Sequence, residues 1–450
     1  MVVKSKNKKL IYMPIEVEVR ELVAKIFLAT KAAKKGYKII IGQKSILNNT
    51  LKMFPPGFYL SGGAFSNYVK FFKKVKEYGF KILVIEEEGL ITYKRKMYLD
   101  MRTDNKCLEL VDRYYLWGKH QLKMLLSKYN QFEKKFFITG NPRFDILGEN
   151  SKYIYEREIN QIKKKYKDFC LICTCFPSIN HFNVEEDFLE TLKKRKTFKT
   201  KKSLNNYIKY QEIKKKTLFE FQEFIREYSI LNPYINIVIR PHPGESVKPY
   251  LGLCKKYKNV FIDKNFSVHP WLISSLFLVH HYCTTSIEAL ALDTKRFSIR
   301  PQSFPEGEYE FPFNCSLTFK SGKEMAKTIT ENKNNLENIN KNLYRKYVNN
   351  IIKFDASDQI VNNIDSSFKR FRIEKKNKKI SWILNIFKRF YVWIFSNYYE
   401  IKRSTYEKNK LKKINKGIII DYITRIEGKD SVDRYKILNL GKNLVSIEIK

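Results

Sequence analysis

Short runs of apolar, β-branched residues recur along the chain and are separated by segments of helix length. A first series of runs lies at 9–13, 37–41, 81–85, 113–117 and 135–139. A second series lies at 169–175, 235–240, 259–262, 276–281 and 296–299. Unbroken apolar runs that alternate with helices are typical of parallel strands covered on both faces. The pattern therefore predicts an α/β protein with two doubly wound lobes.

The same pattern predicts three domains, at 1–160, 161–355 and 356–450. A charged, helix-prone segment at 151–168 links the first two. Inside the second domain, a lysine-rich stretch at 190–228 with few glycines is predicted to be helical, as an inserted hairpin that faces the membrane or an acceptor.

An acidic turn follows the apolar run 81–85, where Glu86, Glu87 and Glu88 precede Gly89. Three adjacent carboxylates repel one another, and desolvation in a cleft would raise the pKa of at least one of them. A general base that works near neutrality needs such a pKa. The alternative is a solvated acidic turn, but an acidic run directly after an apolar strand in so basic a chain favours chemistry.

A basic turn ends the apolar run 237–239 and consists of Arg240, Pro241, His242 and Pro243. Ligands of open α/β sheets bind just beyond the carboxyl ends of the strands, so this turn is a candidate anion site. Two prolines would restrict the loop that carries the imidazole. A proline-rich turn with a solvated histidine is the alternative.

A hydroxyl-rich turn follows the apolar run 277–281 and contains Thr284, Thr285 and Ser286. The next residues predict a helix. Hydroxyl groups and free backbone amides at a helix start bind phosphate well. An ordinary helix N-cap explains the same residues, and both interpretations stay open.

Together, these three motifs resemble those of bacterial GT-B glycosyltransferases that use CMP-activated nonulosonic acids, meaning sialic acid and Kdo-like sugars. The acidic motif corresponds to Glu87-Glu88-Gly89, the HP motif to His242-Pro243 and the serine/threonine motif to Thr284-Thr285-Ser286. Segments 11–20 and 140–145 look like the bacterial surface carbohydrate biosynthesis proteins of the same superfamily. The resemblance spans about residues 8–360 and implies a GT-B-like fold with two Rossmann-type lobes that face one cleft.

The resemblance also implies a reaction, the transfer of a nonulosonic acid from its CMP ester to a glycan or glycolipid acceptor of a capsule or lipopolysaccharide. Glu87 would be the general base, with Glu88 beside it. His242, with Arg240 and Pro243, would stabilise the leaving phosphate.

Further roles follow from the resemblance. The three hydroxyl groups would bind the donor, and Glu288 would contact the nucleotide ribose. Retaining Kdo transferases use a carboxylate nucleophile, for which Asp145 is the candidate here, although it could equally fix a turn by accepting bonds from backbone amides. Members of the superfamily generally need no metal, and the chain has no DxD motif, so we expect no metal and no cofactor besides the donor substrate.

Composition narrows the choice of partner. The formal charge of +40 attracts phosphates, nucleic acid or anionic lipid. Because no zinc-finger, RNP or helix-turn-helix signature accompanies the charge, no nucleic-acid partner is expected. Two other functions remain open: a teichoic-acid-type polyol-phosphate or UDP-sugar transferase, and a noncatalytic membrane- or nucleic-acid-binding protein.

Cysteine usage bears on the compartment. Seven cysteines without a secretory leader predict reduced thiols in a cytoplasmic protein. Cys170, Cys173 and Cys175 are close in sequence, but Cys170 and Cys173 would point to opposite faces of a strand, so we expect them to fill the core and not to bind metal.

The C-terminal extension departs from the two-lobe pattern. Residues 369–415 contain fifteen Lys and Arg against three Glu, with Trp382, Phe387, Tyr391 and Trp393 interleaved. This suits a helix that lies on the inner, anionic face of the cytoplasmic membrane, or one that packs back on the lobes. Whether 417–450 forms a separate unit or docks on a lobe stays open.

Overall fold

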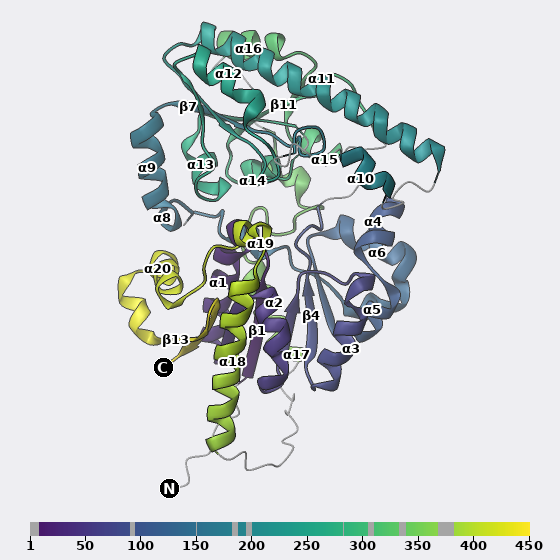
Figure 1. Ribbon diagram of the computed structural model, residues 1–450, viewed down its shortest axis with the longest axis vertical. Helices are drawn as coiled ribbons and strands as arrows, with labels where there is room; N and C mark the ends of the chain where they lie inside the picture. Colours follow the sequence, from purple (N-terminus) through teal and green to yellow (C-terminus); the bar gives the residue numbers. More distant parts are fainter. Residues whose placement is uncertain are drawn as a thin grey trace. The chain divides into compact units, whose positions relative to one another are not determined.

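The structure, a computed structural model, describes residues 9–90, 95–149, 151–181, 188–194, 200–281, 283–304, 310–332, 339–367 and 382–450. The chain forms two compact units. Of the described residues, the first unit comprises those within 9–90, 95–154 and 342–450, and the second comprises those within 155–341. Each unit has its own sheet (Figure 1), and separate hydrophobic clusters pack on the two faces of that sheet. The prediction of two α/β lobes is confirmed.

The first unit is built on an eight-stranded sheet in the order β13-β14-β2-β1-β3-β4-β5-β6. The strands are β1 (Lys9–Ile15), β2 (Tyr37–Gln43), β3 (Phe58–Ser61), β4 (Lys81–Ile85), β5 (Arg113–Leu116), β6 (Phe136–Ile138), β13 (Tyr435–Gly441) and β14 (Leu444–Ile449). Strands β1 to β6 are parallel. Because β2 lies on one side of β1 and β3 on the other, the strand order reverses at β1, and open sheets bind ligands at such a switch point.

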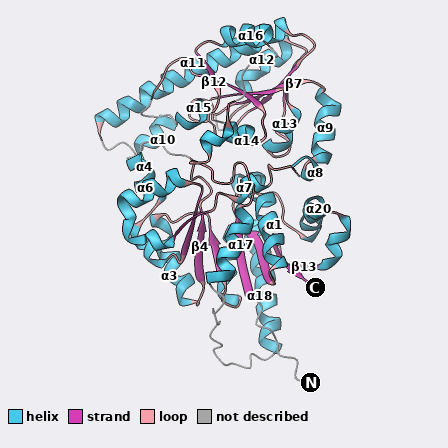
Figure 2. Ribbon diagram, turned by 180° about the vertical axis from the view of Figure 1, so that it is seen from behind, coloured by secondary structure: helices cyan, strands magenta, loops and turns pink. Residues whose placement is uncertain are grey.

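Helices cover both faces of this sheet (Figures 1 and 2). They are α1 (Glu18–Lys34), α2 (Lys44–Thr50), α3 (Val69–Glu77), α4 (Arg95–Arg102), α5 (Asn105–Leu110), α6 (Lys119–Tyr129), α7 (Pro142–Asp145) and α8 (Ser151–Ile154), with 3-10 turns at Leu51–Met53, Ser66–Tyr68 and Asn130–Lys135. Alternate residues of β1 enter different cores: Ile11 and Met13 pack with α1, whereas Tyr12 packs with α2 and α3. The alternation is the two-residue period of a strand.

The C-terminal segment folds with the first unit. Its elements are a 3-10 turn (Lys341–Tyr344), α17 (Ala356–Ser367), α18 (Trp382–Lys402), α19 (Thr405–Lys410), α20 (Lys416–Glu427) and a second 3-10 turn (Lys429–Arg434), followed by β13 and β14. Strand β14 pairs antiparallel with β2, and Ile419, Ile423 and Val445 join the core that α1 covers. Residues 417–450 therefore dock on a lobe. The units differ from the predicted boundaries 1–160, 161–355 and 356–450 because these apolar residues complete the first core.

The second unit contains a six-stranded parallel sheet in the order β12-β11-β10-β7-β8-β9. Its strands are β7 (Phe169–Cys173), β8 (Asn236–Arg240), β9 (Val260–Ile262), β10 (Phe277–His280), β11 (Lys295–Ile299) and β12 (Leu317–Phe319). Its helices are α9 (Glu156–Tyr166), α10 (Phe188–Lys194), α11 (Lys201–Leu231), α12 (Lys248–Lys256), α13 (Val268–Ser274), α14 (Thr285–Ala291), α15 (Glu310–Asn314) and α16 (Gly322–Glu331). The lysine-rich stretch 190–228 is helical in its described part, and residues 195–199 of it lie outside the described residues.

The cysteines of β7 behave as core residues. Cys170 packs against α11 and α16 on one face of the sheet, and Cys173 packs against α9 and α13 on the other. Among the described residues, no group of three or more His, Cys, Asp and Glu side chains is arranged to hold a metal ion. The opposite orientation predicted for these two thiols is confirmed.

Candidate functional site

A pocket of about 310 Å³ opens at the switch point of the first sheet. Part of its lining lies at or just beyond the carboxyl ends of three adjacent parallel strands: Pro14 and Glu16 at β1, Ser61 and Gly62 at β3, and Glu87 and Glu88 at β4. Cationic side chains from three helices complete it: Arg20 and Lys25 of α1, Lys44 of α2 and Arg102 of α4. The predicted acidic motif therefore lies at a ligand-binding position of the fold.

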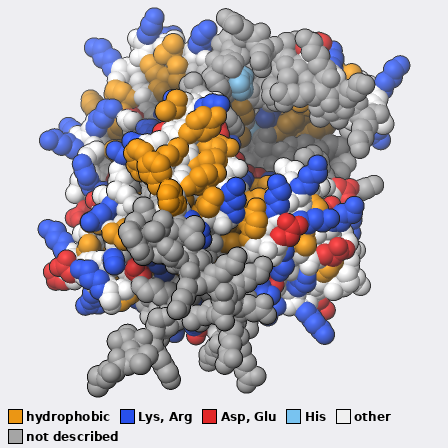
Figure 3. All heavy atoms as spheres, turned by 60° about the horizontal axis from the view of Figure 1, so that its bottom comes forward, with side chains coloured by type: hydrophobic (Ala, Val, Ile, Leu, Met, Phe, Trp, Pro, Cys, Tyr) orange, Lys and Arg blue, Asp and Glu red, His pale blue; other side chains and the backbone are white. Residues whose placement is uncertain are grey.

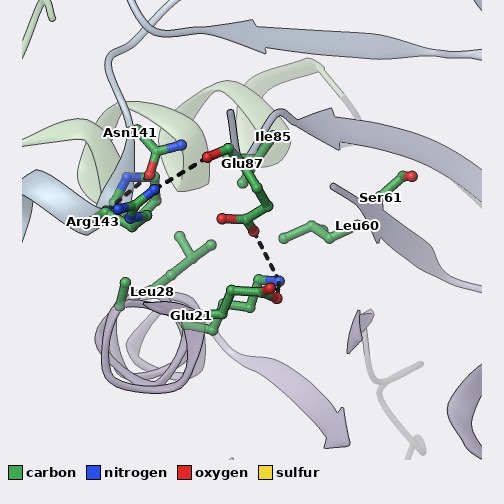
Figure 4. A pocket seen from close by; sticks show the side chains of 11 residues that line it. Glu21, Leu28, Leu60, Ser61, Ile85, Glu87, Asn141 and Arg143 are labelled. Atoms are coloured by element: carbon green, nitrogen blue, oxygen red, sulfur yellow. Dashed lines mark hydrogen bonds and ion pairs between the residues drawn. The ribbon is translucent and has the colours of Figure 1, made fainter. Parts of the chain in front are cut away.

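Glu87 is held at both its backbone and its side chain. It also lines a second, smaller pocket, shown in Figure 4, together with Glu21, Leu28, Leu60 and Arg143. Its Oε1 lies 3.0 Å from Nζ of Lys25, and its carboxylate side chain is 12% exposed. Its carbonyl oxygen accepts from Nη1 of Arg143 at 3.1 Å. Its backbone N–H donates to the carbonyl of Gly62 at 3.2 Å. The carboxylate is therefore oriented into the pocket by fixed contacts.

Lys25 is the cation that organises this end of the sheet. Its ammonium group is buried and makes three short contacts: to the carbonyl of Pro14 at 2.8 Å, to Oε2 of Glu21 at 2.8 Å and to Oε1 of Glu87 at 3.0 Å. An ammonium has three donors, and all are used. Burial alone would lower the pKa of Lys25, but the two carboxylates outweigh it and hold that pKa above its ordinary value. Lys25 stays charged at neutral pH.

Glu88 bridges two arginines at the wall of the same pocket. Its Oε1 lies 3.0 Å from Nη1 of Arg20, and its Oε2 lies 2.8 Å from Nη1 of Arg102. One third of the side chain is exposed. Glu88 is thus a more solvated and more strongly paired carboxylate than its neighbour Glu87.

The first acid of the run, Glu86, points away from the pocket. It is fully buried and accepts from the Tyr98 hydroxyl, from Nε of Arg102 at 2.9 Å and from Nε2 of Gln121 at 2.9 Å. Burial, with a smaller contribution from the Glu88 charge, raises its pKa. The raised pKa predicted for the acidic run therefore belongs to Glu86, a structural residue.

The glycine that follows the acidic run is required by packing. A Cβ at Gly89 would lie 2.3 Å from the Trp117 ring.

Asp145 has the contacts of a residue that fixes a turn. One oxygen accepts from Nδ2 of Asn350 at 2.6 Å and from the backbone N–H of Ala356 at 2.9 Å, and the other accepts from the N–H of Ser357 at 2.6 Å. Burial raises its pKa to about 6. The carboxylate thereby caps the start of α17, which favours the structural role that sequence left open over that of a nucleophile.

In the second unit, the loop after β8 is organised by a carboxylate that sequence analysis did not single out. Glu245 is buried and accepts from the Thr174 hydroxyl at 3.0 Å, the Phe176 N–H at 2.8 Å, the Tyr250 hydroxyl at 3.1 Å and the His242 N–H at 3.2 Å. Burial raises its pKa against the effect of these donors. The spacing of three residues between His242 and Glu245 was the available signal, but a Glu that follows Pro243-Gly244 resembles a solvated turn residue.

His242 is exposed and presents one ring nitrogen outward. Its Nδ1 accepts from the backbone N–H of Gly244 at 3.1 Å, so in the neutral ring the proton is on Nε2. Partial desolvation by the loop and the nearby ammonium groups of Lys214 and Lys264 lower the pKa of His242. The lowered pKa favours the neutral ring, which offers an Nε2–H donor.

The Arg240 guanidinium is less available to bind a phosphate than the sequence suggested. It donates to the carbonyl oxygens of Asn265, at 2.6 Å, and Phe266, and it lies 5.6 Å from the centre of the Trp271 ring. These contacts brace the loop after β9. Pro243 is exposed next to His242.

The hydroxyl-rich turn divides into a buried and an accessible part. Ser286 is buried and donates to the carbonyl of Cys283 at 2.8 Å, whereas Thr284 and Thr285 at the start of α14 are half-buried. Thr284 makes no capping bond with its side chain. Glu288 is buried, with its Oε1 3.7 Å from Nε2 of His269. Of these four residues, the two threonines remain accessible candidates for donor binding.

Glu245 gives a prediction that is independent of function. Glu245→Ala leaves two backbone N–H groups and two hydroxyls unpaired, and we expect it to lower the free energy of unfolding by about 3 kcal/mol. Glu245→Gln should cost less than half of that, because the Thr174 and Tyr250 hydroxyls can turn and accept from its amide. Urea unfolding measures both values, and equal costs for the two variants would contradict the assigned contacts.

Comparison with known proteins defines the class of fold. No protein-family model and no curated protein matches the chain. Solved structures do match. UDP-GlcNAc 2-epimerase from Neisseria meningitidis, bound to UDP-GlcNAc, has a TM-score of 0.52 at 15% identity and covers 80% of this chain and 100% of its own.

Two further solved structures are similar to this chain over a comparable length. UDP-GlcNAc 2-epimerase from Methanocaldococcus jannaschii, in complex with UDP-GlcNAc and UDP, has a TM-score of 0.50 at 14% identity and covers 79% of this chain and 98% of its own. The wall teichoic acid polymerase TagF has a TM-score of 0.51 at 12% identity and covers 81% and 90%. The chain thus has a GT-B-like fold with two Rossmann-type lobes, as predicted.

Proposed function

We propose that the protein is a GT-B-type transferase of bacterial surface glycan assembly whose donor is activated by a nucleoside diphosphate, either a UDP-sugar or a teichoic-acid-type polyol phosphate. The matched structures support this donor class, since two are complexes with UDP-GlcNAc and a third is a wall teichoic acid polymerase. They lend no support to a CMP-nonulosonic acid donor. CMP is therefore included among the nucleotides in the binding experiment below.

One observation carries the proposal. In each unit, beyond the carboxyl ends of parallel strands, a buried carboxylate holds a candidate reactive group in place. Glu21 acts through Lys25 on Glu87, and Glu245 accepts from the backbone of His242. Buried charges are costly, and at strand ends of this fold such arrangements mark functional sites.

The proposed reaction assigns the acceptor to the first unit and the donor to the second. The acceptor hydroxyl loses its proton to Glu87 as its oxygen bonds to the transferred group. The bond between that group and the nucleotide breaks, and the nucleotide leaves with the electron pair. The Nε2–H of His242 donates to a phosphate oxygen as negative charge develops there, with Thr284 and Thr285 as further donors.

Calorimetry against UDP, CDP, CMP and a short RNA tests the donor class. We expect UDP or CDP to bind about tenfold more tightly than CMP, because a second phosphate adds charge-assisted hydrogen bonds. His242→Ala should weaken the binding of UDP or CDP about tenfold. His120→Ala, which replaces a histidine of the first unit, should leave this affinity unchanged. Tightest binding of CMP would restore the nonulosonic acid donor, and salt-sensitive RNA binding alone would exclude a transferase.

Incubation with UDP-GlcNAc in the absence of any acceptor distinguishes a transferase from an epimerase. We expect the sugar nucleotide to remain unchanged, apart from slow hydrolysis, until an acceptor is added. Conversion to the 2-epimer, followed by NMR of the anomeric proton, would contradict the proposal.

Turnover should persist in excess EDTA. The chain has no DxD motif to hold a divalent ion against a diphosphate, and the proposed chemistry uses only protein donors. Transfer is measured with and without the chelator, with Mg²⁺ added back as a control. A loss of turnover that Mg²⁺ restores would contradict metal independence.

A further inference from the structure

Helix α18 presents an apolar face to solvent. Its exposed large side chains are Phe387, Phe390, Tyr391, Trp393, Ile394, Tyr398 and Ile401. Apart from Trp393, they recur at intervals of three and four residues, so they form one stripe along the helix. The protein face seen in Figure 3 carries such a gathering of apolar side chains, with Lys and Arg side chains beside it.

The opposite side of α18 fastens the helix to the first unit. Val392 is buried in the core shared with α2 and β14, and the Ser396 hydroxyl accepts from the N–H of Lys442 at 3.0 Å. Gly441 approaches so closely that a Cβ there would lie 2.4 Å from Oγ of Ser396. Arg403, just beyond the helix, donates to the carbonyl of Glu407 at 2.8 Å. The helix is thus amphipathic with its apolar stripe facing outward.

Basic side chains lie beside the stripe. Lys52 lies 5.8 Å from the centre of the Tyr391 ring, and Lys402 lies 4.5 Å from that of Tyr398. Lys388 and Arg389 lie in the helix between Phe387 and Phe390. Aromatic rings combined with Lys and Arg are typical of helices that lie in the interface of an anionic bilayer.

We propose that the α18 stripe docks on the surface of an anionic membrane, with the helix parallel to the bilayer plane. Among the described residues, none of the helices combines the length and apolar character that spanning a bilayer requires. Residues 369–381 of the basic segment lie outside the described residues. A second copy of the chain fits the stripe less well, because two-fold pairing would bring the basic flanks of both copies together.

The proposal is independent of the enzymatic function and is tested on the full chain with lipid vesicles. One set contains equal parts of phosphatidylglycerol and phosphatidylcholine, and the other contains phosphatidylcholine only. We expect cosedimentation with the anionic vesicles, weakened by high salt. Phe387→Gln/Ile394→Gln/Ile401→Gln should lower the partition coefficient about a hundredfold, since three apolar side chains no longer enter the interface.

A matched control carries the same kind of change elsewhere. Phe219→Gln/Ile230→Gln/Leu343→Gln also removes three exposed apolar side chains and should bind vesicles like the wild type. Sedimentation velocity without lipid tests the alternative, in which a second copy of the chain occupies the stripe. Equal vesicle binding by the wild type and the α18 variant would overturn the proposal. So would a wild-type dimer that ignores vesicles and that the α18 substitutions dissociate.

Discussion

Glu87→Gln should lower kcat by about a thousandfold and leave the affinity for the nucleotide unchanged. A general base contributes roughly 10²–10⁴-fold to a rate, and glutamine cannot take the acceptor's proton. Its amide oxygen can still accept from Lys25, which lies 3.0 Å from the carboxylate, so the pocket keeps its shape. Steady-state rates with saturating donor and acceptor give kcat, and calorimetry gives nucleotide affinity.

Glu88→Gln is the matched control for this prediction. Glu88 lies in the same turn and lines the same pocket, but Arg20 and Arg102 already neutralise it. Its substitution should change kcat by less than about tenfold, which is the range of a lost exposed ion pair. Full activity of Glu87→Gln together with an inactive Glu88→Gln would move the base to Glu88. Full activity of both would remove the acidic motif from catalysis.

The strands that sequence predicted share a physical property that the missed ones lack. The central parts of β4 and β8, at 82–85 and 237–239, are unbroken apolar runs buried on both faces, so local pattern alone identifies these strands. Strand β3 is only four residues long and follows Pro55-Pro56-Gly57, which reads as a turn. Strand β14 pairs with β2 across four hundred residues of sequence, and no local pattern names a partner at that distance.

The candidate site shows the same division. Acids and a histidine directly after apolar strands were predictable, because the carboxyl ends of parallel strands are where this class of fold binds ligands. The residues that hold these acids and the histidine in place were not predictable from the sequence. Lys25 stands among apolar residues of α1 and resembles a solvated lysine, although its spacing of four from Glu21 was a signal for an ion pair. Glu87 is fixed by side chains that are distant in sequence and meet only in the folded protein. Tertiary packing therefore determines its contacts, and local sequence does not.

Lys25→Met should strongly destabilise the first unit. It removes a buried ammonium from between Glu21 and Glu87 while keeping the volume of the side chain, and it leaves Glu21, which is 2% exposed, short of its nearest cation. Breaking a buried ion pair by removing one partner costs roughly 3–5 kcal/mol. Glu21 still accepts from the N–H groups of Glu16 and Val17, so we expect the lower end, about 3 kcal/mol. Urea unfolding followed by circular dichroism gives the value.

Lys31→Met tests whether this cost comes from burial. Lys31 lies on the same helix and pairs with Asp358 at 2.9 Å, but that pair is exposed, so its loss should cost less than about 1 kcal/mol. A double variant separates charge from packing. Adding Glu21→Gln to Lys25→Met removes the uncompensated carboxylate, so the double variant should lose less stability than the two single variants combined. Strict additivity, or equal costs at Lys25 and Lys31, would mean that the Glu21–Lys25–Glu87 cluster does not hold the pocket together.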